Sequence, residues 1–362
     1  MLPLRLAALI FLATLTACSA TQTVGRPEGP APVTGKWALA IHGGAGVISR
    51  KDMSPQAQAQ HAASLRKALT VGKEILAKGG SALDACEQVV RTLEDDPHFN
   101  AGKGAVFTAD ARHELDAAIM DGQTLQAGAV TGVKTVKNPI SLARLVMQRT
   151  RHILLSGDGA ETFATTVGVE RVPNTYFDTD YRRKVLDEVL EERRRESQKP
   201  AARSDGPATD PVAFAARARH THTNAFGTVG CVALDSAGNL AVATSTGGLT
   251  GKQWNRIGDS PQIGAGTYAN NRSAAISGTG TGEQFIRHTV ARDVAALIEY
   301  KGFSAQQAAE EVVFRRLNPD DGGVIVVSRT GEIALVFSTE GMYRGAANSS
   351  GRFEVAIWKN NE

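Results

Sequence analysis

The first pattern along the chain is a short apolar segment near the N-terminus. Arg5 precedes the apolar residues Leu6 to Leu15, a stretch that is too short to span a bilayer and is typical of a secretory signal. It runs into Leu15-Thr16-Ala17-Cys18, which has the pattern of a bacterial lipobox. We therefore expect residues 1–18 to form a lipoprotein-type signal, with Cys18 lipidated as the first mature residue. The alternative is a plain signal peptide cut near Ala20.

The residues after Cys18 extend this prediction. Ser19, rather than Asp, follows the cysteine, as in lipoproteins sorted to the outer membrane. Residues 19–35 are rich in Pro, Gly, Thr and Ala, which is typical of a flexible tether. We expect an exported, periplasmic lipoprotein that touches the outer membrane only through its lipid.

From Lys36 onwards the pattern becomes that of one folded domain, residues 36–362. A buried strand is expected at Trp37 to Ile41, followed by a tight glycine turn at His42-Gly43-Gly44-Ala45-Gly46. Ser54-Pro55 and Ser81 mark two helix starts, and a loop at 99–106 is expected to lead into a strand. Further strands are expected at 115–120 and 127–133, and further helices at 139–148 and 181–198, the last with Tyr181, Val185, Leu186, Val189 and Leu190 on one apolar face.

Residues 199–226 break this order. They contain Pro200, Gly206, Pro207 and Pro211 with little periodicity, and they predict a long exposed linker, which needs an explanation inside a compact domain. Strand patterns then follow at 228–234, 240–245, 274–277, 324–328 and 333–337, with a hairpin turn at 235–239. Two helices with capping boxes are expected to begin at Thr281 and Ser304.

Composition narrows the classes of function. Of the 362 residues, 42% are apolar and 21% charged, as in an ordinary globular protein. The net charge of +3 and the scattered basic residues indicate no nucleic-acid partner, and Arg193-Arg194-Arg195 is expected to be a solvated helix end. Only Cys86 and Cys231 follow Cys18, so we expect two buried thiols rather than a disulfide framework.

Several familiar sites are excluded by spacing. No serine has glycines two residues before and after it, and Gly247 to Gln253 lacks the last residue of a P-loop. Gly278 to Gly282 has the wrong spacing for a dinucleotide fingerprint, and His113-Glu114 lacks a second histidine at zincin spacing. His220 and His222 lie in the linker and are expected to be solvated. We expect no catalytic metal and no cofactor for catalysis.

What remains is the stretch Gly227-Thr228-Val229-Gly230 at the end of the linker. A threonine hydroxyl needs a base, and an N-terminal threonine carries one in its own α-amine, whose pKa is about 8 in model peptides. Gly227 has no Cβ, so its carbonyl can be approached closely. Taken alone, however, these residues fit a hairpin glycine followed by a β-branched strand residue better.

The surrounding motifs change that balance. Over Lys36 to Tyr343 the sequence resembles the plant-type asparaginase and isoaspartyl peptidase family of N-terminal-nucleophile hydrolases. The motifs that carry the resemblance share their order and spacing; they are 42–46, 99–102, 113–117 with 120–122, 227–230, 243–248, 256–261, 278–283 and 340–344.

The resemblance implies autocleavage between Gly227 and Thr228, which gives an α chain, 36–227, and a β chain, 228–362. Thr228 would be the nucleophile and Thr246 would tune its hydroxyl. Asn100 and Thr279 would form the oxyanion hole. Arg256 would bind the substrate α-carboxylate and Asp259 the α-ammonium. Ile257, Gly258, Gly280, Thr281 and Gly282 would complete the substrate-binding residues.

The same resemblance implies a wider architecture and activity. The fold would be α+β, a four-layer αββα sandwich, and two cleaved protomers would pair as a homodimer. A structural sodium would lie in the loop from Leu93 to Lys103, bound by backbone carbonyls. The substrates would be isoaspartyl dipeptides and L-asparagine. The alternatives are a glycosylasparaginase and an uncleaved, inactive lipoprotein that binds ligands or partners.

Two residues depart from the family pattern. Gly251 stands where Asn is usual, and Asn255 stands where Gly precedes the arginine. Because Asn tolerates the left-handed backbone region, we expect a changed entrance to the site rather than lost activity.

Overall fold

The computed structural model of the chain describes residues 35–198 and 227–359. The predicted signal with Cys18, the tether up to residue 34 and the linker 199–226 lie outside the described residues.

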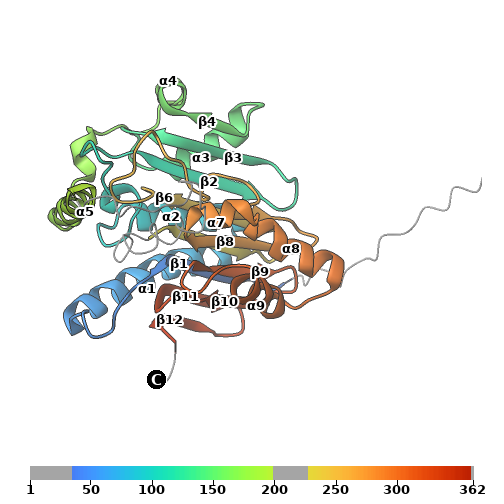
Figure 1. Cartoon of the computed structure of the whole chain (residues 1–362). Helices are drawn as coiled ribbons and strands as arrows, with labels where there is room; N and C mark the ends of the chain where they lie inside the picture. The colour runs from blue at the N-terminus through green and yellow to red at the C-terminus, as the bar shows by residue number, and fades with distance from the viewer. Residues whose placement is uncertain (1–34, 199–226, 360–362) are drawn as a thin grey trace, which may run out of the picture.

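The described residues mix helices with two β-sheets (Figure 1). The larger sheet has the order β12-β11-β1-β5-β6-β2-β3-β4 and is antiparallel except between β3 and β4. The smaller sheet has the order β10-β9-β8-β7 and is antiparallel throughout. The strands are β1 Ala38–Gly46, β2 Leu115–Asp121, β3 Ala127–Val133, β4 Leu154–Ser156, β5 Val229–Leu234, β6 Leu240–Thr246, β7 Thr267–Ala269, β8 Ala274–Gly280, β9 Gly322–Ser328, β10 Ile333–Phe337, β11 Gly341–Asn348 and β12 Phe353–Trp358.

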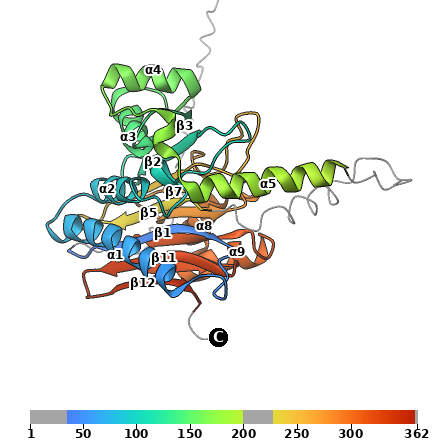
Figure 2. The same ribbon diagram turned by 90° about the vertical axis from the view of Figure 1, so that its left-hand side faces the viewer.

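Helices pack against the outer face of each sheet. α1, α2, α3 and α4 contact the larger sheet, and α8 and α9 contact the smaller one. α5 buries only part of its N-terminal half and projects away from the sheets (Figure 2). The helices are α1 Pro55–Ala77, α2 Ala82–Glu94, α3 Pro139–Arg149, α4 Gly157–Val167, α5 Asp180–Gln198, α7 Gly282–Arg287, α8 Val290–Lys301 and α9 Ala305–Arg315, with 3-10 turns η1 Gly102–Gly104 and η2 Asn174–Phe177.

Alternation along the strands explains how the sheets are buried on both sides. In β1, Leu39 and Ile41 belong to the apolar cluster under α1 and α2, whereas Ala38 and Ala40 belong to the cluster between the two sheets. In β8, Ile276 faces the helices on the smaller sheet. Both faces of the central strands are therefore apolar, which explains their nearly continuous hydrophobic sequences.

Most predicted elements are confirmed. Ser54 and Ser81 cap α1 and α2 by accepting backbone N–H groups, and Ser304 begins α9 with a complete capping box. β5 and β6 pair across the predicted turn at 235–239. Cys86 and Cys231 are buried and free.

Other expectations were wrong. β1 does not end before the glycine turn but continues to Gly46, with a bulge between His42 and Gly44. The loop after Asn100 does not lead into a strand, since β2 begins only at Leu115. Thr281 makes no side-chain cap, and its predicted helix is divided into α7 and α8 at Thr289, whose φ is +46°. β4, α4, β7, β11 and β12 were not predicted.

Candidate active site

Thr228 lies directly before β5, between strands β1 and β6, and is almost fully buried. Its hydroxyl donates to Thr246 Oγ1 at 3.3 Å, and the Thr246 hydroxyl in turn donates to the carbonyl oxygen of Gly227, also at 3.3 Å. Both distances are longer than the usual O–H···O separation. Thr246 is held by the N–H of Gly248, which donates to its Oγ1 at 3.0 Å. One hydroxyl thus contacts both the predicted nucleophile and the bond before it.

Gly44 and Asn100 pack closely against the predicted cleavage bond. A Cβ at Gly44, where φ is +115°, would lie 2.6 Å from the Cα of Gly227 and 3.3 Å from the nitrogen of Thr228. A Cβ at Gly227 would lie 3.0 Å from Cβ of Asn100. The bulge in β1 therefore presses Gly44 against the peptide that joins Gly227 to Thr228.

Asn100 and Thr279, the predicted oxyanion donors, are fully buried. The Asn100 amide donates to the Gly248 carbonyl at 2.8 Å and its Oδ1 accepts from Val106 at 2.9 Å, so one of its two amide hydrogens remains for a ligand. Thr279 Oγ1 accepts from the Ala45 N–H at 3.2 Å, which leaves its own hydroxyl hydrogen for another acceptor.

A chain of buried hydrogen bonds runs from Thr228 into the space between the sheets. His42 Nδ1 lies 2.8 Å from the Thr228 carbonyl oxygen, and its Nε2 lies 2.8 Å from Ser277 Oγ. Burial lowers the pKa of His42 to about 4, so the ring is neutral, with its hydrogen on Nδ1 facing the carbonyl. Ser277 then donates to Nε2 and bonds Thr244 at 2.8 Å, and Thr267 donates to Thr244 at 2.7 Å.

A buried charge cluster supports the strand that carries Thr246. Asp116 pairs with Thr246 across the β2–β6 ladder. Lys252 Nζ donates to the Glu114 carbonyl at 2.9 Å and lies 3.9 Å from the Glu114 carboxylate and 4.0 Å from that of Asp116. Burial raises the pKa of Asp116, and the charges of Lys252 and Arg256 oppose that rise.

Arg256 forms a bidentate pair with Glu283, with Nε and Nη2 each 2.9 Å from a carboxylate oxygen. A Cβ at Gly248 would lie 3.7 Å from Arg256 Nη1, so the guanidinium lies close to the turn that holds Thr246. Glu283 was not assigned a role from the sequence, and it occupies two of the donors predicted for the substrate carboxylate.

Asp259 is buried beside Arg256. One of its oxygens, Oδ2, has no hydrogen-bond partner among the described residues. Burial raises the pKa of Asp259 to about 7, although the charge of Arg256 opposes that rise. Gly282 packs between the two side chains, since a Cβ there would lie 2.7 Å from Arg256 Nη2 and 3.0 Å from Asp259 Oδ1.

The other predicted binding residues are placed unevenly. A Cβ at Gly258 would lie 2.8 Å from Arg256 Nη1. Gly280 and Thr281 pack against the Asp321 backbone, where the Thr281 N–H donates to the Asp321 carbonyl at 2.7 Å. The Ile257 side chain is exposed. The structure therefore brings Gly258 and Gly282 close to the Arg256 guanidinium, whereas the side chain of Ile257 is exposed to solvent.

Backbone carbonyl oxygens of the loop from Leu93 to Lys103 lie close to two glycines. A Cβ at Gly104 would lie 2.1 Å from the Phe99 carbonyl oxygen and 2.5 Å from that of Pro97, and a Cβ at Gly102 would lie 2.3 Å from that of Glu94. Carbonyl oxygens are suitable ligands for a hard cation. Within the described ranges, no group of three or more His, Cys, Asp or Glu side chains is placed to hold a metal.

Comparison with known proteins identifies the family of this chain. The family model described as asparaginase matches residues 35–357, nearly the whole chain. The chain belongs to this asparaginase family.

Relatives in distant organisms match the same region. A protein of Escherichia coli (strain K12) named isoaspartyl peptidase is 48% identical over 312 residues, which cover 86% of this chain and 92% of that protein. An Arabidopsis thaliana protein named probable isoaspartyl peptidase/L-asparaginase 2 is 44% identical, with 90% of this chain and 100% of that protein covered. A Rattus norvegicus protein named isoaspartyl peptidase/L-asparaginase is 38% identical over 88% of each chain.

Some residues of this asparaginase-family site could not be found from the sequence. His42 and Asp116 stood in motifs of the resemblance without an assigned role, and Lys252 was assigned no role either. On α5 the predicted apolar face is partly wrong, because Tyr181 is exposed while Arg182 is buried. Arg193, expected to be solvated, donates to the carbonyl of Gly251 at 2.7 Å.

The two departures from the family pattern both lie in the left-handed backbone region. Gly251 has a φ of +68°, and Asn255 has a φ of +54°, the left-handed conformation expected of it. Trp254, next to Asn255, shares this conformation and is 94% exposed.

Proposed function

We propose that this chain is a threonine amidohydrolase that cleaves itself between Gly227 and Thr228 and then hydrolyses β-aspartyl dipeptides and L-asparagine. The contact of Thr246 with both Thr228 Oγ1 and the Gly227 carbonyl oxygen supports the proposal most directly. The relatives named isoaspartyl peptidase/L-asparaginase support the substrate class.

Self-cleavage follows from this contact. Thr228 Oγ attacks the Gly227 carbonyl carbon, and its proton passes to Thr246 Oγ1 as the hydroxyl hydrogen of Thr246 passes to the carbonyl oxygen. The C–N bond then breaks as that proton moves from the former carbonyl oxygen to the Thr228 nitrogen, and an ester joins Gly227 to the threonine oxygen. Water hydrolyses that ester and leaves a carboxylate on Gly227 and a free α-amine on Thr228.

Substrate hydrolysis reuses the same oxygen. The free α-amine takes the Thr228 hydroxyl proton as the oxygen attacks the substrate β-carbonyl carbon. The second amide hydrogen of Asn100 and the Thr279 hydroxyl stabilise the developing oxyanion. The leaving amine takes the proton from the α-amine, and water then hydrolyses the acyl ester to release aspartate.

The head group of the substrate is recognised by charge. The guanidinium of Arg256 binds the α-carboxylate and shares its donors with Glu283. Asp259 Oδ2, which has no hydrogen-bond partner among residues 35–198 and 227–359, accepts from the α-ammonium. This pair fits both an isoaspartyl peptide and free asparagine, because the two share the same α-groups.

The proposal extends to the whole molecule. The two helix-covered sheets constitute the four-layer αββα sandwich of N-terminal-nucleophile hydrolases, and two cleaved protomers form a homodimer. A structural sodium would be bound by backbone carbonyls of the loop from Leu93 to Lys103, among which those of Glu94, Pro97 and Phe99 lie beside Gly102 and Gly104, and it would stiffen the loop that carries Asn100. Residues 1–18 and 19–35 would export and tether the enzyme through Cys18. No helix of the described residues is long and apolar enough to cross a membrane.

A substrate panel tests this function. Purified protein is incubated with β-aspartyl-leucine, L-asparagine and a glycosylated asparagine, and released aspartate is measured. We expect turnover of the first two. Turnover of the glycosylated substrate alone would identify a glycosylasparaginase, and an intact, inactive protein would favour the ligand-binding lipoprotein.

A further inference from the structure

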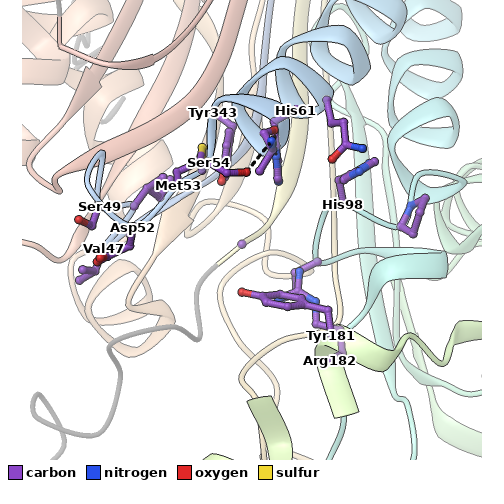
Figure 3. Close-up of a pocket in the computed structure, with 18 residues that line it drawn as sticks. Val47, Ser49, Asp52, Met53, Ser54, His61, His98, Tyr181, Arg182 and Tyr343 are labelled. Atoms are coloured by element: carbon purple, nitrogen blue, oxygen red, sulfur yellow. Dashed lines mark hydrogen bonds between the residues drawn. The ribbon is translucent and has the colours of Figure 1, made fainter. Parts of the chain in front are cut away.

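A pocket of about 510 Å³ opens beside the predicted cleavage bond. Gly227 and Asn100 lie in its wall, together with residues of the segment between β1 and α1, of α1 and of the start of α5 (Figure 3). Arg256 and Asp259 are not part of the wall. A substrate whose head group is held by Arg256 therefore has this separate space available for the other side of its scissile bond.

Arg182 is the unusual residue in this wall. It is only 6% exposed, and its Nε–H donates to the Gly104 carbonyl at 2.8 Å. No carboxylate of residues 35–198 and 227–359 forms an ion pair with it. The acidic side chain in the wall, Asp52, lies on the opposite side of the pocket in Figure 3. A buried guanidinium without a counter-charge favours an anionic ligand.

The rest of the pocket suits the side chain of a small peptide. The His61 and Tyr343 rings stack with their centroids 4.6 Å apart, and both line the pocket. Burial lowers the pKa of His61, so that its ring is neutral at pH 7. The pocket thus offers aromatic surface next to one buried positive charge.

We propose that this pocket binds the leaving amino acid of a β-aspartyl dipeptide and that Arg182 binds its α-carboxylate. The inference rests on the proposed function. In such a dipeptide the carboxylate is joined to the scissile nitrogen through the α-carbon alone, so it stays close to the reacting bond. Cleavage frees Gly227 from Thr228 and joins the pocket to the nucleophile. L-Asparagine releases only ammonia and makes no use of Arg182.

The test compares kcat/KM for β-aspartyl-leucine, for its C-terminal amide and for L-asparagine. In the wild type, the free acid is expected to be preferred over the amide by about 10- to 100-fold. Arg182→Gln should reduce the ratio of β-aspartyl-leucine to L-asparagine turnover by a similar factor and remove the preference for the free acid. Arg182→Lys, which retains the charge but loses the planar fork, should give an intermediate ratio.

Lys184→Gln is the matched control, because this lysine is exposed on the same helix and pairs only loosely with Glu188. It should leave both ratios unchanged. Equal turnover of the free acid and the amide by the wild type would overturn the proposal. That result is expected if Arg182 instead binds the new carboxylate of Gly227. An equal loss on all three substrates in both Arg182 variants would also overturn it and reduce Arg182 to a support for Gly104. Absence of L-asparagine turnover in the wild type would instead count against the proposed function itself.

Discussion

Behind Thr228, His42, Ser277 and Thr244 form a continuous chain of buried hydrogen bonds, whereas the loop on the far side of Thr246 carries charge that is only partly compensated. There Arg256 shares its donors with Glu283, and Asp259 buries an oxygen without a hydrogen-bond partner among the described residues. In the proposed function, the first region would hold the nucleophile in place before any ligand arrives. The second would be completed by a ligand that carries both charges.

The largest effect that separates these regions is expected at Arg256. Arg256→Ala removes both charged hydrogen bonds to the substrate carboxylate and should lower kcat/KM for β-aspartyl-leucine by about 100-fold, on the order of 3 kcal/mol. Self-cleavage, followed on a denaturing gel, should proceed as in the wild type, because the proposed cleavage step does not involve Arg256. An unchanged KM for β-aspartyl-leucine would reject the proposed binding of the substrate carboxylate by Arg256.

A smaller effect is expected from pH at Asp259. Because its pKa is raised to about 7 and only the ionised form binds an ammonium, kcat/KM should fall by up to about tenfold for each pH unit below 7. The sign is that of an acid whose charged form is required, so the loss occurs on the acidic side. In Asp259→Asn this contribution should disappear, so that the remaining acidic loss is no steeper than protonation of the Thr228 α-amine alone produces. A slope as steep as that of the wild type would assign the titration near pH 7 to another group.

On the other side of Thr228, His42→Ala should remove the ring that hydrogen-bonds the Thr228 carbonyl and leave the Ser277 hydroxyl with Thr244 as its remaining partner. We expect a loss of about 1–3 kcal/mol in the free energy of unfolding. The measurement is urea unfolding in a Thr228→Ala background, which keeps both proteins uncleaved. Ser277→Ala in the same background should lower the free energy of unfolding by part of this amount. The double variant His42→Ala/Ser277→Ala should be only slightly less stable than His42→Ala alone. Additive losses would show that the two residues do not act as one chain.

The smallest effect is expected at Glu94. Burial raises the pKa of this carboxyl to about 8, so it is protonated at pH 7, where it accepts from Ser245 Oγ at 2.6 Å and from the Ile140 N–H at 3.1 Å. Glu94→Gln keeps an oxygen acceptor and should change kcat/KM at pH 7 by no more than about twofold. A tenfold loss would mean that Glu94 acts as a carboxylate.

The sequence predicted the parts of this molecule that depend on local pattern. Helix caps at Ser54, Ser81 and Ser304 and the β5–β6 hairpin follow from short-range chemistry, and the order of the Gly, Thr and Asn motifs marked Thr228 and Thr246. β11 was missed because Gly341–Asn348 has few β-branched residues and is formed by its pairing with β1.

The parts that were missed depend on contacts between distant residues. His42 meets Thr228 and Ser277 across sequence separations of 186 and 235 residues, which no local pattern records. Arg182 was hidden because a charged residue in an amphipathic helix is expected to face solvent, whereas here it reaches the Gly104 carbonyl. The positions of His42 and Arg182 therefore depend on tertiary contacts and could not be predicted from local sequence.

Intact-mass analysis of the purified wild type and of Thr228→Ala tests the central claim most directly. The account predicts that the wild type separates into two chains, the smaller beginning Thr-Val-Gly, and that Thr228→Ala remains one uncleaved chain. A folded wild type that stays intact would contradict the account. Cleavage of the same bond in Thr228→Ala would contradict it as well.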